Sequence, residues 1–214
     1  MPYVKENYIN PALLIRSMSK EIFQEIGKKT VHIIILIALI FFFAIKNRAG
    51  HQAALLFLTS LLIIFLVLEY LRLDLNLKIP FFHQFIRPKE EHSVYGIIFF
   101  LSSTIIALAV FDTVIALAAL LMTTFGDMSA AIAGKKYGTT MLFRNKTVVG
   151  FVTELVTNLI VAVAISLFFS INIYIPIIMA FAATITETLV DEIEDNLAVP
   201  IVSGFIGQIL LLAI

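Results

Sequence analysis

The sequence predicts an all-α protein with about seven transmembrane helices, and its composition and hydrophobic pattern lead to that prediction. Of the 214 residues, 60% are hydrophobic and only 14% are charged, whereas soluble domains carry about 25% charged residues. The hydrophobic residues are grouped into long runs separated by polar segments. Because a helix satisfies its own backbone hydrogen bonds in lipid, such runs are expected to be helical.

Seven runs can be distinguished. In chain order they cover 30–45, 51–71, 94–111, 113–125, 148–169, 171–186 and 197–214. A helix needs about 20 residues to cross the hydrocarbon, with about 17 as a practical minimum. Most runs meet this requirement, while 113–125 and 171–186 are short. We expect residues 1–29 to form a cytoplasmic N-terminal segment and 30–214 a single transmembrane domain. A charged segment precedes the first run and no small-residue cleavage site follows it, so a removed signal peptide is not expected.

The distribution of basic residues predicts the orientation. With seven spans, the segments 1–29, 72–93, 126–147 and 187–196 lie on one side of the membrane, and they contain thirteen of the fifteen Lys and Arg residues. The other side has only Lys46 and Arg48. Because basic residues are concentrated on the cytoplasmic side of membrane proteins, the N-terminus and these four segments are expected in the cytoplasm. The chain has no cysteine, which excludes disulfides and thiolate chemistry.

The stretch 126–138, "GDMSAAIAGKKYG", combines small and charged residues. Small residues recur every four positions at Gly126, Ala130, Gly134 and Gly138, a spacing that allows two helices to approach closely. Asp127 comes just after the run 113–125, separated from it by Gly126, and an acid there could simply favour a helix start. The spacing excludes a Walker-type phosphate loop, which requires four residues between its glycines and a Ser or Thr after its Lys.

The segment 187–195 is strongly acidic. If it were helical, Glu187, Asp191 and Asp195 would share one face, with Glu194 beside them. Like charges at this spacing destabilise a helix, so we expect a compensating cation, and Mg²⁺ prefers such hard oxygen ligands. A solvated acidic loop is the structural alternative. Asn196 and Pro200 are expected to start the last span, with Pro200 in a tolerated first-turn position.

Three carboxylates lie within or at the ends of the runs, where acids are costly and therefore candidates for function. Glu69 is three residues before Arg72 and is expected to pair with it on one helix face. Asp112 is expected in a solvated outer turn. Glu154 shares a helix face with Asn158, and its role is left open.

A further polar group, Lys28, Lys29 and His32, stands at the entrance to the first run. Basic side chains at this depth commonly extend to the membrane surface without any further function. The alternative is that they close a site formed by the other cytoplasmic segments.

Read together, these motifs resemble a known family. Their order is "KKTVH", "EYLR", "RPKEEHSVYG", "GDMSAAIAGKKYG", "KTVVG" and "ETLVDEIEDNLAVPIVSG". The chain resembles, over about residues 21–204, the CTP-dependent lipid kinases that include dolichol kinase, phytol kinase and the CTP-using diacylglycerol kinase. It is more distantly similar to phosphatidate cytidylyltransferase, but the "EDNLAVP" ending favours the kinases. Both groups usually have an acid where this chain has Val149, and Glu154 is a possible substitute.

The resemblance implies a transmembrane catalytic domain that transfers a phosphoryl group from CTP to a lipid alcohol at the cytoplasmic face, with Mg²⁺ (or Mn²⁺) as cofactor. The implied catalytic residues are Asp127, also the candidate general base, Lys146 and Asp195. The implied metal ligands are Asp127, Glu187, Asp191, Glu194 and Asp195. The implied nucleotide-binding residues are Lys28, Lys29, His32, Gly134, Lys135, Lys136, Gly138, Arg144 and Thr147. Residues without an assigned role are Glu69, Arg72, Glu154 and Asn196.

Two other functions stay open from the sequence. A cytidylyltransferase would form a CDP-lipid and release pyrophosphate. A cation or proton-coupled transporter would use the buried acids as a path, but the two halves of the chain show no repeat of the kind that transporters often contain. The lipid could be a polyprenol or dolichol, a phytol-like isoprenoid or a diradylglycerol. Membrane lipids surround the protein, no nucleic-acid partner is expected, and the sequence does not predict the oligomeric state.

Overall fold

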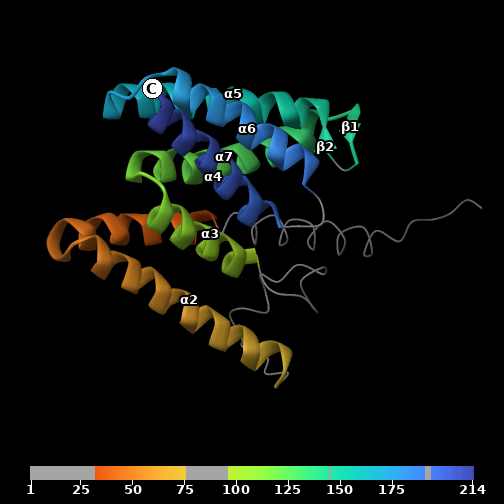
Figure 1. Cartoon of the computed structure of the whole chain (residues 1–214). Helices are drawn as coiled ribbons and strands as arrows, with labels where there is room; N and C mark the ends of the chain where they lie inside the picture. The colour runs from red at the N-terminus through yellow and green to blue at the C-terminus, as the bar shows by residue number, and fades with distance from the viewer. Residues whose placement is uncertain (1–31, 76–95, 145, 191–193) are drawn as a thin grey trace, which may run out of the picture.

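The computed structural model describes residues 32–75, 96–144, 146–190 and 194–214. This part of the chain contains a helical bundle and one small hairpin (Figure 1). The helices are His32–Ala49, α2 (His51–Leu73), α3 (Gly96–Val110), α4 (Thr113–Tyr137), α5 (Val148–Phe169), α6 (Tyr174–Leu189) and α7 (Asp195–Ala213). Strands β1 (Met141–Phe143) and β2 (Lys146–Thr147) form an antiparallel pair between α4 and α5. The predicted all-α fold is therefore confirmed, with this hairpin as an addition.

Five of the helices are long and apolar enough to cross a membrane: His32–Ala49, α2, α4, α5 and α7. Helices α3 and α6 have 15 and 16 residues and are shorter than a typical span. The run 113–125 was predicted to be a short span, but it is the first half of the 25-residue helix α4. The helix continues because the residues after Gly126 include several alanines, which favour helix. Asp127 consequently lies in the middle of α4, and its interpretation as a helix-start residue is wrong.

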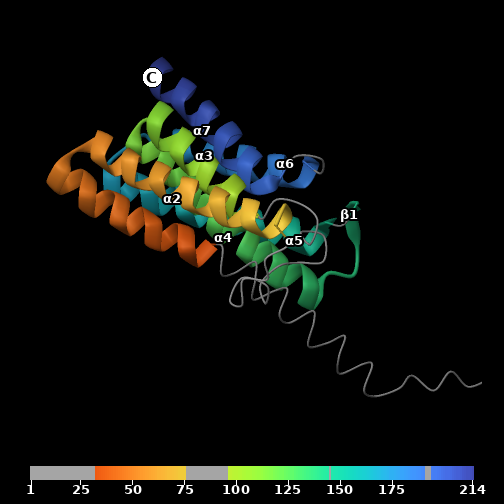
Figure 2. The same cartoon turned by 90° about the horizontal axis from the view of Figure 1, so that it is seen from below.

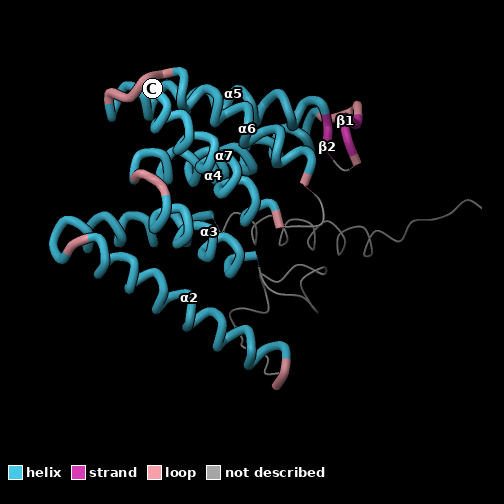
Figure 3. Tube along the Cα trace, viewed as in Figure 1, coloured by secondary structure: helices cyan, strands magenta, loops and turns pink. Residues whose placement is uncertain are grey.

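Successive helices run in opposite directions, and α4 lies at the centre of the bundle (Figures 1 and 2). Helix α4 contacts α3, α5, α6 and α7, while α2 contacts α3 at the periphery. The ends of α2, α4 and α6 and the beginnings of α3, α5 and α7 therefore gather at one end of the bundle. The hairpin lies at this same end, where Figure 3 shows it as the magenta segment among cyan helices.

Apolar side chains cover much of the outer surface as well as the core. Leu56 on α2 is 67% exposed and Phe168 on α5 is 85% exposed, while α4 is the most buried of the long helices. Isolated apolar side chains are normal on soluble proteins, but a surface this rich in them indicates contact with a nonpolar environment. The five long apolar helices are compatible with an integral membrane protein.

Helices α4 and α5 pack closely through small residues, as the four-residue spacing predicted. A Cβ atom added at Gly126 would lie 2.7 Å from Asn158 Oδ1, and one at Gly150 would lie 3.3 Å from the carbonyl oxygen of Ala130. Side chains larger than hydrogen at these positions would push the helices apart. The stripe ends at Gly138, which caps the C-terminus of α4 by donating its backbone N–H to the Gly134 carbonyl. The close packing of α4 against α5 brings the polar residues of these two helices together.

The connection between α6 and α7 corrects the prediction for the acidic segment. Residues 187–195 do not form one helix, because α6 ends at Leu189 and is followed by Val190 in an extended conformation. Glu194 is also extended and precedes α7, which begins at Asp195. Glu187 and Asp195 thus belong to two helices rather than to one face of a single helix. Asp191 lies outside the described residues.

Pro200 lies inside α7 rather than in its first turn as predicted. A proline at this position removes the N–H that would bond the carbonyl four residues earlier, which belongs to Asn196. The hydroxyl of Ser103 on α3 lies 2.7 Å from that carbonyl oxygen and can donate to it. This contact satisfies a buried backbone acceptor and connects α3 to the beginning of α7.

Candidate functional site

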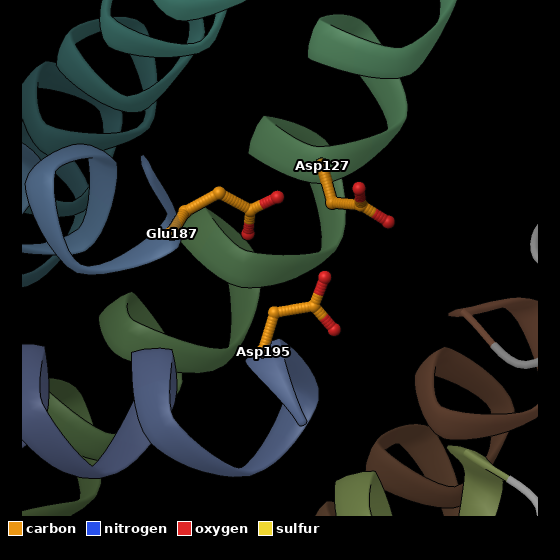
Figure 4. Close-up of side chains that lie close together, drawn as sticks. All are labelled: Asp127, Glu187 and Asp195. Carbon is orange, nitrogen blue, oxygen red and sulfur yellow. The ribbon is translucent and has the colours of Figure 1, made fainter. Parts of the chain in front are cut away.

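Three carboxylates from three helices meet at the end of the bundle where the hairpin lies. They belong to Asp127 in the middle of α4, Glu187 in the last turn of α6 and Asp195 at the beginning of α7. One carboxylate oxygen of each lies within 4.8 Å of the others, and Figure 4 shows the side chains directed toward one another. We call these residues the acidic cluster. Asp127 and Glu187 are buried, and Asp195 is partly buried.

Lys146 supplies a positive charge to the acidic cluster. Its Nζ atom donates a hydrogen bond to Glu187 Oε1 over 2.6 Å. Burial acts to lower the pKa of Lys146, but the carboxylates of Glu187, Asp195 and Asp127 more than offset it, so the pKa lies above its ordinary value. The ammonium group is therefore charged at neutral pH.

The backbone around the hairpin fixes the position of Lys146. The next residue, Thr147, caps α5 by accepting a hydrogen bond at Oγ1 from the Gly150 N–H (3.1 Å). Val148 N–H donates to the Thr140 carbonyl over 3.0 Å. The first bond caps the beginning of α5 and the second joins that beginning to the residue before β1, so the strand that carries Lys146 is fixed against the start of α5.

His32 lies next to the acidic cluster, which agrees with one of the two alternatives that the sequence left open for this residue. Its Nε2 atom lies 3.4 Å from Asp127 Oδ2, and its ring packs edge-on against Phe100 at 5.6 Å between ring centroids. The side chain is buried, so it is not merely extending to the membrane surface. Lys28 and Lys29, which were grouped with it, lie outside the described residues.

A second polar layer lies next to the acidic cluster, toward the interior of the bundle. Glu154 on α5 is buried and interacts electrostatically with Glu187, Lys146, Asp127 and Asp195. One turn further along α5, Asn158 Nδ2 donates to Thr184 Oγ1 on α6 over 3.0 Å. The sequence left the role of Glu154 open, and the structure places it beside the cluster. Thr184 was not predicted, although its position one turn before Glu187 is the signal that could have indicated it.

The other predicted phosphate-binding cations lie around the hairpin. Lys135 and Lys136 are exposed in the last turn of α4, and Arg144 is exposed after β1. Lys136 Nζ lies 5.1 Å from the centroid of the Tyr137 ring. Their predicted contact with nucleotide phosphates stays a prediction. The ammonium group of Lys146, by comparison, contacts the acidic cluster through Glu187.

Gly134, Gly138 and Thr147 pack against one another. A Cβ at Gly134 would lie 3.0 Å from Thr147 Oγ1, and one at Gly138 would lie 2.7 Å from it. These contacts give the three residues a role in joining α4 to α5. Their predicted approach to phosphate stays a prediction.

The remaining candidates have structural contacts. Arg72 donates to Glu69 through Nε (3.0 Å to Oε2) and Nη2 (2.5 Å to Oε1), which confirms the predicted pairing. Asp112 is exposed and caps α4 at the opposite end of the bundle by accepting from the Val114 N–H (2.8 Å), as expected for an outer turn. Glu194 precedes α7 and is partly buried, and the buried Asn196 donates its backbone N–H to Asp195 Oδ1 (2.9 Å).

The donor set of the acidic cluster fits a hard divalent cation. All three ligands are carboxylate oxygens, which Mg²⁺ and Mn²⁺ prefer. Glu187 is only 1% exposed, and within the described part of the chain its Oε2 atom has no hydrogen-bond partner. A buried carboxylate oxygen without a partner is costly, and a cation bound by the cluster would satisfy it.

Comparisons of the chain with protein-family models, with curated proteins and with solved structures found no match. The functional interpretation therefore depends on the geometry of this site and on the motifs of the sequence.

Proposed function

We propose that the protein is an integral membrane kinase that transfers the γ-phosphoryl group of CTP to a lipid alcohol. The observation that carries the proposal is the acidic cluster with Lys146 in contact, held where several helix ends meet. Phosphoryl transfer depends mainly on positioning and on neutralising the phosphate charges. A group of carboxylates able to hold a divalent cation, beside a charged lysine, suits that requirement.

In this proposal Asp127, Glu187 and Asp195 hold Mg²⁺ or Mn²⁺, which would neutralise charge on the nucleotide phosphates. Lys146 contacts the phosphates directly, exchanging part of its interaction with Glu187 for one with the substrate. Asp127 is the candidate acceptor for the proton of the lipid hydroxyl, with His32 at 3.4 Å. Glu154 and Asn158 support the cluster from the interior. The sequence motifs that resemble the CTP-dependent lipid kinases favour CTP as the donor.

The position of the site suits a substrate that is itself a lipid. A lipid alcohol presents its hydroxyl near the membrane surface, whereas the nucleotide approaches from water. The site lies at one end of the bundle, between helix ends, and both substrates can meet there. We propose seven spans with this end in the cytoplasm, because thirteen of the fifteen Lys and Arg residues belong to the segments on that side.

The proposed orientation can be tested with single cysteines, because the natural chain has none. In intact cells, Ala49→Cys should react with a membrane-impermeant maleimide, since residue 49 lies at the opposite end of the bundle from the site. Thr140→Cys, which is next to the hairpin, should react only after the membrane is permeabilised. Both positions are exposed, so the pair is matched for access. The reverse pattern would place the site on the side without CTP and would contradict the proposal.

The activity is tested with the full chain and CTP labelled at the γ-phosphorus, incubated with Mg²⁺ and a panel of lipid alcohols. We expect the label in an organic-phase monophosphate, with CDP as the second product. ATP labelled in the same way serves as the comparison donor. If label is released only as pyrophosphate and a phosphorylated lipid is required, the protein is a cytidylyltransferase. Transport of a cation without any nucleotide turnover would contradict both enzymatic functions.

A further inference from the structure

The hairpin exposes apolar side chains on both of its faces. Met141, Leu142 and Phe143 of β1 are 60%, 46% and 41% exposed, and all three positions of the strand are open. Neighbouring side chains of a strand point to opposite faces, so both faces of β1 are only partly covered by the described part of the chain. Tyr137, at the end of α4, is 61% exposed nearby. An isolated two-stranded hairpin is marginally stable in water, and the exposed apolar side chains of this one are available for a further stabilising contact.

The length of α5 places the hairpin at the membrane surface. Helix α5 begins at Val148, directly after β2, and has 22 residues, which correspond to about 33 Å at 1.5 Å per residue. The hydrocarbon core is about 30 Å thick. If α5 crosses it, the beginning of α5 lies at the boundary between acyl chains and headgroups. Met141 pairs with Thr147, the residue before α5, so β1 lies at this depth too.

Basic side chains surround the apolar ones. Lys135, Lys136 and Arg144 are exposed, and the Arg144 guanidinium lies 5.3 Å from the centroid of the Phe143 ring. The Lys136 ammonium group likewise lies 5.1 Å from the centroid of the Tyr137 ring. Aromatic rings and basic groups are the side chains that anchor proteins at the membrane interface, and basic groups near the surface are attracted by anionic lipids.

We propose that the hairpin is an interfacial anchor that inserts into the headgroup layer of the protein's own membrane. Met141, Leu142 and Phe143 contact the upper acyl chains, while Lys136 and Arg144 bind the phosphates of anionic lipids. This assignment gives the two cations a lipid phosphate as partner in place of the nucleotide phosphate that the sequence suggested. It depends on α5 crossing the membrane and not on the proposed kinase activity.

The test uses the absence of tryptophan from the natural chain. Phe143→Trp gives a single fluorescent reporter in the hairpin, and Val156→Trp, at an exposed position in the middle of α5, gives a matched reference deep in the bilayer. The full-length variants are reconstituted into vesicles that contain lipids brominated either near the headgroup or near the chain ends. We expect shallow bromines to quench Phe143→Trp most strongly and deep bromines to quench Val156→Trp most strongly. Quenching of Phe143→Trp by aqueous iodide but by neither brominated lipid would overturn the proposal.

A second arm identifies the partner of the cations. Phe143→Trp is compared in phosphatidylcholine vesicles with and without phosphatidylglycerol, alone and combined with Lys136→Gln and Arg144→Gln. We expect quenching by the shallow bromines to increase with phosphatidylglycerol and to lose about half of that increase in the Gln variants. Equal quenching in both vesicle types would contradict the assignment of lipid phosphate. Loss of the lipid quenching on addition of CTP with Mg²⁺ would assign these cations to the nucleotide instead.

Discussion

Asp127→Asn and Asp195→Asn are each expected to reduce lipid phosphorylation by about a hundredfold or more while the protein still folds. Asparagine has nearly the shape of aspartate but no negative charge, so it cannot replace a carboxylate that holds a divalent cation. The two residues come from α4 and α7, and their equal sensitivity would indicate that both helices contribute to one site.

The measurement compares initial rates of label transfer from γ-labelled CTP over a range of Mg²⁺ concentrations. Binding of Mn²⁺, followed by its electron paramagnetic resonance signal, gives a readout that is independent of turnover. Asp112→Asn is the matched control, because it makes the same change at an exposed helix cap at the other end of the bundle. Asparagine also caps helices well, so both rate and Mn²⁺ binding should stay at the natural level. Wild-type rates in EDTA would contradict the requirement for a cation.

Lys146→Ala is expected to lower both the stability and the activity of the protein, for two separable reasons. The variant leaves the Glu187 carboxylate, which is 1% exposed, without its hydrogen-bonded cation. Because Lys146 itself is partly exposed, we expect a loss of about 1–3 kcal/mol, between the values for surface and buried ion pairs. The loss of a positive charge from the phosphates should reduce kcat by about a hundred- to a thousandfold, which corresponds to about 2.7–4 kcal/mol.

The double variant Lys146→Ala with Glu187→Gln separates these two effects. Removing the uncompensated carboxylate should restore most of the thermal stability, measured by circular dichroism in detergent, because the pair is directly coupled. Activity should stay lost, since a phosphate-binding cation and a metal ligand are both missing. Lys46→Ala is the control, because Lys46 Nζ donates to Thr113 Oγ1 (2.7 Å) at the opposite end of the bundle, away from the acidic cluster. Recovery of activity together with stability would mean that Lys146 has only a structural role.

Helix lengths show where local sequence was informative and where it was not. The apolar runs located each helix, because a long apolar segment can satisfy all of its backbone hydrogen bonds internally as a helix. Their ends were less certain: the run 113–125 gave no sign that α4 continues through Asp127 to Tyr137. A charged residue in mid-helix is tolerated there because other helices surround it with polar groups, and these groups come from distant parts of the chain.

The sequence by itself determined the helical class, the polar character of one end of the bundle, the close packing at Gly126 and the pairing of Glu69 with Arg72. Each of these follows from spacing within one segment. The family resemblance grouped Asp127 with Glu187 and Asp195, but only the tertiary structure showed how these acids meet. Glu187 and Asp195 were expected on one helical face, but they approach each other because α6 ends and α7 begins beside the middle of α4. The contact of Lys146 with Glu187 joins residues 41 positions apart, and such contacts depend on how helices pack, which no local pattern encodes.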